Sequence, residues 1–315
     1  MKASLPYGLL LLLLGLILAV LVVFALGQGA YPLSGTEVLR ALAAGFGSDP
    51  EAGQNQAVRV VWDLRLPRIA AALLVGAALS TAGAAYQTMF RNPLVSPDIL
   101  GVSSGAGLGA ILAIYLNFSL FGVQMAAFVG GLLAVGIVLS LARMLRHHPP
   151  ILILVLAGMA VGTLLGAALS LIKILADPYS QLPSMTFWLL GGLSAVRSYE
   201  VWPAAMMVLA CIVPVWLLRW RINVLALQDE EARSLGMPVS ALRCLLIVCA
   251  TLMTAVCVAL AGIIGWVGLL IPHAARLLVG PDFSRLLPVC LLVGAAFLLL
   301  TDTLARSIGT LELPL

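Results

Sequence analysis

Charged residues are scarce in this sequence. Asp, Glu, Lys and Arg make up 10% of its 315 residues, and Lys2 and Lys173 are its lysines. A soluble domain carries about 25% charged residues, so the composition excludes an ordinary water-exposed surface. It also excludes intrinsic disorder, which requires low hydrophobicity together with high net charge.

Histidine and cysteine are scarce too, and their spacing excludes several kinds of site. The chain has three histidines, none in an H-E-x-x-H pattern, and five cysteines that lie inside apolar segments without metal-site spacing. Neither lysine follows a glycine, so no phosphate-binding G-x-x-x-x-G-K-[ST] loop exists. The arginines form no basic stripe for nucleic acid. We expect no catalytic residue, no metal site and no cofactor bound by this chain.

Long apolar runs dominate what is present. The sequence is 62% hydrophobic, and a helical bilayer span needs about 20 apolar residues. We therefore predict an all-α, polytopic membrane protein that forms a single domain over residues 1–315 in the lipid bilayer. Nine complete transmembrane helices are expected at Pro6–Leu26, Ile69–Phe90, Ile99–Leu116, Phe121–Leu145, Ile151–Leu175, Trp202–Leu218, Leu242–Ala261, Gly265–Leu278 and Leu286–Leu304.

The charges between the runs indicate an orientation. If the N-terminus is cytoplasmic, ten of the 17 Lys and Arg residues fall on the cytoplasmic side, as the positive-inside rule requires. No charge lies in the middle of a run, which argues against a proton- or sodium-coupled pump. The energy for any transport is expected to come from outside this chain.

Two segments interrupt the helical pattern, one in each half of the chain. Pro93 and Pro97 stand at the junction between the second and third runs, and Gly265, Gly268 and Pro272 give a short, broken eighth run. Paired broken segments in corresponding halves are typical of a transporter's translocation path. We expect these five residues to lie along such a path.

Glycines recur every four residues in two of the runs. They are Gly101, Gly105 and Gly109, and then Gly158, Gly162 and Gly166. This spacing predicts close helix packing, with the lining of a conduit as the alternative.

The longest inward loop, at about 219–243, has the composition of a short helix. Its acids come early and Arg233 comes late, which suits the helix dipole, and Gly236 is a stop signal. We expect an amphipathic helix on the cytoplasmic face. It is either a surface linker or a docking helix for a cytoplasmic partner.

Six motifs occur in an order that resembles a known family. They are Arg65-Leu-Pro-Arg68, Asn92-Pro-Leu94, Ser96-Pro-Asp-Ile-Leu-Gly101, Ala226…Leu235-Gly236, Gly265-Trp-Val-Gly-Leu-Leu-Ile-Pro-His273, and Leu304-Ala-Arg306 with Glu312-Leu-Pro314. From about Ala57 onwards the sequence resembles the FecCD/BtuC family, permease subunits of binding-protein-dependent ABC importers for iron–siderophores, haem and cobalamin.

The resemblance implies a fold, a function and partners. It implies a BtuC-like permease in the bacterial cytoplasmic (inner) membrane that imports a metal chelate by ATP-driven alternating access. The partners would be a second copy of the chain, two cytoplasmic ATPase subunits that bind ATP and Mg, and an extracytoplasmic substrate-binding protein.

The resemblance also assigns roles to individual residues. Outward arginines that meet the binding protein match Arg65, Arg68 and Arg306. The inner gate matches Asn92 and Leu94, with His147 and His148 in the loop that would complete it. The coupling helix that fits the ATPase matches a stretch that contains Asp229, Glu230, Glu231, Arg233, Leu235 and Gly236.

Some alternatives stay open at this point. Family members continue past Glu312-Leu-Pro314 with a tenth span, which in this sequence is either cut off or lacking. An importer of the same family for an oxyanion such as molybdate is the nearest functional alternative, followed by an autonomous secondary transporter. An intramembrane enzyme would need paired catalytic groups, and Asp177 and Asp302 have no evident partners in the sequence.

Overall fold

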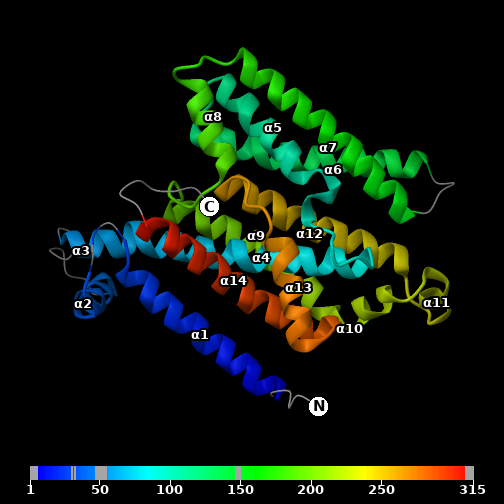
Figure 1. Cartoon of the computed structure of the whole chain (residues 1–315), viewed down its shortest axis with the longest axis horizontal. Coiled ribbons are helices and arrows are strands. Elements are labelled where there is room, and N and C mark those ends of the chain that lie inside the picture. Colours follow the sequence, from blue (N-terminus) through cyan, green and yellow to red (C-terminus); the bar gives the residue numbers. More distant parts are fainter. Residues whose placement is uncertain (1–5, 30, 32, 47–54, 146–149, 309–315) are drawn as a thin grey trace.

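The computed structural model describes residues 6–29, 31, 33–46, 55–145 and 150–308, and the regular structure in these ranges is helical throughout (Figure 1). The α-helices are α1 (Tyr7–Gly27), α2 (Gly35–Phe46), α3 (Gln56–Arg59), α4 (Leu66–Met89), α5 (Val102–Tyr115), α6 (Leu120–Met144), α7 (Pro150–Leu175), α8 (Gln181–Leu190), α9 (Ser198–Leu217), α10 (Arg219–Ile222), α11 (Asp229–Ser234), α12 (Val239–Ala261), α13 (Val267–Val279) and α14 (Phe283–Ile308). A π-helical turn η2 (Val60–Arg65) and two 3-10 turns, η3 (Pro97–Leu100) and η4 (Asn223–Ala226), join some of them.

The nine predicted runs are all helices. Among the described residues, seven helices are long and apolar enough to cross a membrane, and α5 and α13 are shorter apolar helices. Every backbone polar group inside a bilayer must be satisfied within the protein, which helices achieve along their own length. The all-α, polytopic prediction is confirmed.

The second helix begins earlier than predicted. Helical structure runs from Gln56 to Met89 without a gap, whereas the apolar run begins at Ile69. The turn η2 and Pro67, at the start of α4, lie inside this continuous segment. Proline inside a helix removes one backbone hydrogen bond, and the π-helical turn η2 directly before it is a local departure of the kind that accommodates such a loss.

The core is built around α4. In its most apolar window 78% of the residues are buried, against 11% for α1 at the edge of the molecule. The helix packs against α12, α13 and α14, and Figure 1 shows it crossing the middle of the molecule. The outer helices α1, α6, α7 and α9 keep large apolar side chains exposed, as expected of surfaces in contact with lipid.

Glycine permits the closest contact of this core. A methyl group on Gly83 of α4 would lie 1.8 Å from the carbonyl oxygen of Gly268 on α13. Only a residue without a side chain fits such a backbone approach.

Most of the periodic glycines also serve packing. A methyl group on Gly105 would lie 2.4 Å from the carbonyl oxygen of Gly130, and one on Gly158 would lie 2.0 Å from that of Ile99. Gly166 differs, because a methyl group there would have no neighbour within 4 Å. The predicted close packing therefore holds for part of the pattern and fails at its last position.

The two ends of the long helices form two faces. At one face lie α2, α3 and the end of α14, and at the other lie α10 and α11 (Figure 1). The Tyr7 hydroxyl donates to the carbonyl oxygen of Arg285, which places the start of α1 beside the start of α14. We call the face with α11 the inner face and the opposite one the outer face, following the predicted orientation.

Candidate functional site

The two broken segments meet inside the molecule. The α-helix is interrupted between Met89 and Val102, and again between Ala261 and Val267. A methyl group on Gly268 would lie 2.5 Å from Cδ of Pro97, so the start of α13 packs directly on η3. Irregular backbone at membrane depth is tolerated where it is buried in protein or lines a cavity. The sequence thus identified two breaks that are neighbours in space.

Pro272 does not have the predicted effect. It lies buried inside α13, whose helix continues past it, and the break comes earlier, at residues 262–266. Proline leaves the carbonyl four residues before it without a helical partner, here that of Gly268. This carbonyl is the one that approaches Gly83. Gly265 faces open space, where a methyl group would meet nothing within 4 Å.

The predicted gate residues form an exposed turn at the inner end of α4. The Leu94 N–H donates to Oδ1 of Asn92 at 2.9 Å, and Asn92, Pro93 and Leu94 are exposed. Arg91, just before the turn, adopts a positive φ of 53°, which non-glycine residues rarely do. His147 and His148 lie outside the described residues. The gate assignment stays a prediction.

The predicted short helix of the inner loop is present as α11. Its first turn contains Asp229, Glu230 and Glu231, and Glu231 accepts a hydrogen bond from the Gln228 N–H at 3.1 Å. The helix ends at Ser234, and Gly236, two residues further on, has a φ of +74°, the left-handed conformation that glycine adopts readily. Glu230, Glu231, Arg233 and Leu235 are exposed. α11 therefore offers a mixed charged and apolar surface beyond the inner helix ends.

An ion-pair cluster that the sequence did not reveal fixes α11 to the rest of the molecule. Arg243 on α12 donates two hydrogen bonds to the Asp229 carboxylate, at 3.1 and 3.2 Å, and Arg91 donates a third. Arg91 also donates to the carbonyl oxygen of Leu225 at 3.1 Å. The hydrogen bond with Arg243 holds the pKa of Asp229 below its ordinary value, against the opposing effect of burial. The gate turn and the predicted coupling helix are thus directly linked.

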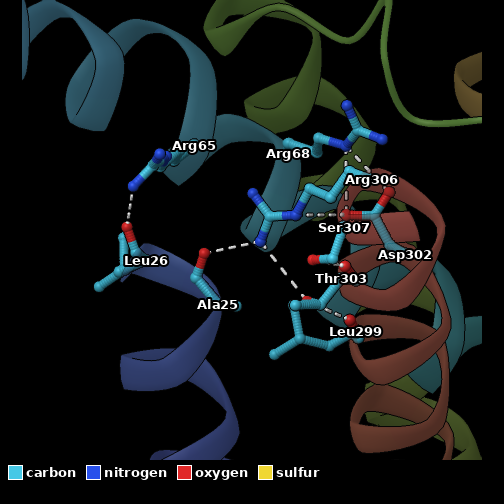
Figure 2. A network of polar contacts seen from close by, with 9 residues as sticks. All are labelled: Ala25, Leu26, Arg65, Arg68, Leu299, Asp302, Thr303, Arg306 and Ser307. Atoms are coloured by element: carbon cyan, nitrogen blue, oxygen red, sulfur yellow. Dashed lines mark hydrogen bonds and ion pairs between the residues drawn. The ribbon is translucent and has the colours of Figure 1, made fainter. Parts of the chain in front are cut away.

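The three outer arginines form an internal network (Figure 2). Nε of Arg68 donates to both carboxylate oxygens of Asp302, at 2.9 and 3.1 Å, and Nε of Arg306 lies 3.8 Å from Oδ2 of Asp302. Asp302 is fully buried, while Arg65 and Arg68 are 4% and 9% exposed. The expectation that Asp302 has no partner is wrong. Its partner Arg68 is 234 residues away in the sequence.

The same network secures the end of α1. Arg65 donates to the carbonyl oxygens of Leu26 and Tyr31, and Arg306 donates to that of Ala25 at 2.7 Å. Carbonyls in the last turn of a helix lack intrahelical partners, and cations are favourable there. Contact between these arginines and a binding protein stays a prediction, because in this structure the three side chains bind groups of their own chain.

A pocket of about 850 Å³ opens at the outer face between α8, the α5–α6 connection and the end of α12. Aromatic side chains and amides line it, among them Phe118, Phe187, Trp188, Asn117 and Gln181. The described residues that line it include no charged side chain. Its volume lies in the range of small-molecule sites.

A polytopic helical bundle with paired helix breaks beside a central helix defines the class of membrane transport permeases. The chain belongs to the FecCD transport family, whose model matches residues 17–315.

Named relatives cover most of this chain. It is 38% identical over 305 residues to the molybdate import system permease protein MolB of Haemophilus influenzae, covering 96% of this chain and 89% of that protein. It is 40% identical over 284 residues to the cobalamin import system permease protein BtuC of Halobacterium salinarum, covering 90% and 75%. A solved structure described as an inward-facing metal-chelate type ABC transporter matches with a TM-score of 0.85 and 37% identity, covering 98% and 93%.

Proposed function

We propose that this chain is the permease subunit of an ABC importer that moves a metal chelate across the cytoplasmic membrane of a bacterium. The observation that carries the proposal is the contact between η3 and the start of α13, where two helix breaks lie against the central helix α4. Helix breaks of this kind permit a path to open and close without unfolding the long helices.

The inner cluster supplies a physical link for ATP-driven alternating access. An ATPase that binds the exposed side chains of α11 would move Asp229, and with it Arg91 and the Asn92 turn. In the proposed cycle this motion opens the gate formed by Asn92 and Leu94. ATP and Mg are bound by the ATPase, and this chain contributes no cofactor and no catalytic residue.

The proposed assembly follows the family. Two copies of the permease enclose the path, two ATPase subunits dock on the inner face, and a substrate-binding protein docks on the outer face. The N-terminus is cytoplasmic in this arrangement, so that α11 faces the ATPase. The outer arginine network would stabilise the surface on which the binding protein docks.

A chelate fits the outer pocket better than an oxyanion does. The relative MolB is named for molybdate, which makes an oxyanion the second candidate. Compact anions are bound by Arg, Lys or backbone N–H groups. The aromatic and amide side chains that line the outer pocket suit the organic part of a chelate instead.

The docking of an ATPase on α11 gives the direct test. The permease would be co-expressed with the ATPase and the binding protein of its own transporter, and ATPase co-purification and iron-chelate uptake into proteoliposomes would be measured. We expect Leu235→Glu, at a 64% exposed residue of the α11 surface, to abolish both. The matched control for ATPase co-purification is Leu39→Glu at the outer face, away from the ATPase, where Leu39 is 68% exposed. Retention of both properties by Leu235→Glu would refute the docking role.

A further inference from the structure

A second pocket, of about 320 Å³, lies at the inner face between α6, α7, α11 and α12. Three arginines line it, Arg143 from α6, Arg233 from α11 and Arg243 from α12, together with the hydroxyl of Ser240. We call it the inner arginine pocket. None of the sequence motifs pointed to it, because the three arginines come from separate segments.

The lining of the inner arginine pocket gathers positive side chains. The described residues that line it include no Asp or Glu, and the acid bound to Arg243 is Asp229. Arg243 is 8% exposed, and its Nε has no hydrogen-bond partner in the described part of the chain. A buried N–H without a partner is unfavourable. An anion bound among the arginines would accept a hydrogen bond from this group.

The walls of the pocket become apolar with depth. Counted from the first residue of α12, Arg243 lies about 6 Å along the helix axis and Ile247 about 12 Å. Leu139 and Leu154 line the pocket from α6 and α7. With the first residue of α12 at the outer edge of the headgroup region, which is about 5–7 Å thick, Arg243 lies near the boundary with the hydrocarbon. A ligand with an anionic head and an apolar tail matches this gradient.

We propose that the inner arginine pocket binds the phosphate headgroup of an anionic phospholipid, with an acyl chain against Leu139, Leu154 and Ile247. Guanidinium groups bind phosphate through paired hydrogen bonds, and basic pockets between helices at the cytoplasmic side favour anionic headgroups. Since Arg233 belongs to α11, a bound headgroup joins the predicted coupling helix to α6 and α12.

Lipid binding to the purified, delipidated full chain in detergent tests this inference. Native mass spectrometry would count the bound molecules of phosphatidylglycerol or phosphatidylcholine, and inorganic phosphate would be added as a competitor. Ser240→Glu places a carboxylate in the pocket. Its control is Ala241→Glu, the next residue of α12, which is exposed and outside the lining. We expect phosphatidylglycerol to bind the wild type and Ala241→Glu equally, and Ser240→Glu at least about fivefold more weakly, the effect of one surface charge.

Three results would overturn the inference. They are equal phosphatidylglycerol binding by the two Glu variants, equal binding of phosphatidylcholine and phosphatidylglycerol by the wild type, and displacement of the lipid by millimolar phosphate, which would assign the pocket to a free anion. If Ser240→Glu does not fold, Arg143→Gln replaces it. Arg143 is exposed and takes no part in the Asp229 pairs, and its loss should weaken phosphatidylglycerol binding in the same direction.

Discussion

Arg91 donates a hydrogen bond to the carboxylate of Asp229, and this contact joins the turn at Asn92 to the first residue of α11. Two further hydrogen bonds from Arg243 hold the same carboxylate against α12. A displacement of α11 therefore either moves the turn or breaks these bonds. The linkage makes Asp229 the central residue of the proposed coupling between the ATPase and the gate.

Replacement of Asp229 by Asn should separate ATP hydrolysis from transport. The exposed residues of α11 remain, so the ATPase should still co-purify and hydrolyse ATP. Uptake into proteoliposomes should fall by about tenfold, the factor that corresponds to one charge-assisted hydrogen bond. The control Asp63→Asn removes an exposed acid remote from this cluster and should leave uptake unchanged. Full uptake by Asp229→Asn would contradict the proposed linkage.

The same carboxylate gives a pH dependence with a defined sign. Hydrogen bonding to Arg243 lowers the pKa of Asp229 from its ordinary value of 3.8. Its contribution to stability is thus complete above pH 3.8 and is lost as the pH falls through the lowered pKa. In thermal unfolding, the midpoint of the wild type should exceed that of Asp229→Asn by a constant amount at neutral pH. This difference should narrow only in acid below about pH 3.8. Narrowing between pH 7 and 5 would contradict the assignment.

Local signals in the sequence predicted the nine apolar helices, the two breaks and α11, since apolar runs, prolines and Gly236 act within a few residues. The ion pairs could not be predicted in this way. Arg91 and Asp229 are 138 residues apart, and Arg68 and Asp302 are 234 apart. In the sequence Asp302 is one acid at the end of an apolar run, and only the packing of α14 on α4 gives it a partner. The contacts of the candidate site depend on this packing.

Removal of one member of the buried pair should destabilise the chain severely. Arg68→Met leaves the fully buried Asp302 carboxylate facing Arg306, whose Nε lies 3.8 Å from Oδ2. Breaking a buried pair by removing one partner costs about 3–5 kcal/mol, and at 3.8 Å Arg306 compensates only part of the charge left on Asp302. The reversible unfolding of the purified chain in mixed detergent micelles would measure this loss.

The double variant Arg68→Met with Asp302→Leu provides the control. Replacing both partners by apolar side chains of similar volume is often neutral or stabilising. We expect it to recover part of the stability that Arg68→Met loses, because Arg306 keeps its hydrogen bond to the carbonyl oxygen of Ala25 but loses its carboxylate partner. Equal losses in the single and double variants would mean that the network acts through Arg306 and the end of α1 instead.

Filling the outer pocket should block chelate transport without affecting the assembly. Ser184 lines this pocket, whereas Thr186, two residues along α8, does not, and each hydroxyl donates to the carbonyl four residues before it. Ser184→Trp should reduce iron-chelate uptake by about tenfold or more, and Thr186→Trp should leave it unchanged. ATPase co-purification should be normal for both. Equal uptake by the two variants would exclude the pocket from the substrate's route.

The contact of α4 with α13 predicts a difference between two conservative substitutions. Gly83→Ala places a methyl group 1.8 Å from the carbonyl oxygen of Gly268, so α13 must move away from α4. Gly166→Ala on α7 is the control, because its methyl group meets nothing within 4 Å. Overpacking costs about 1–3 kcal/mol of stability. Gly83→Ala should therefore unfold at a lower concentration of a denaturing detergent, and it should lose transport. Gly166→Ala should be at least as stable as the wild type, because it adds no clash within the chain and alanine favours a helix over glycine. If Gly83→Ala were equally stable, the two breaks would not depend on close packing, and their contact could not control the path.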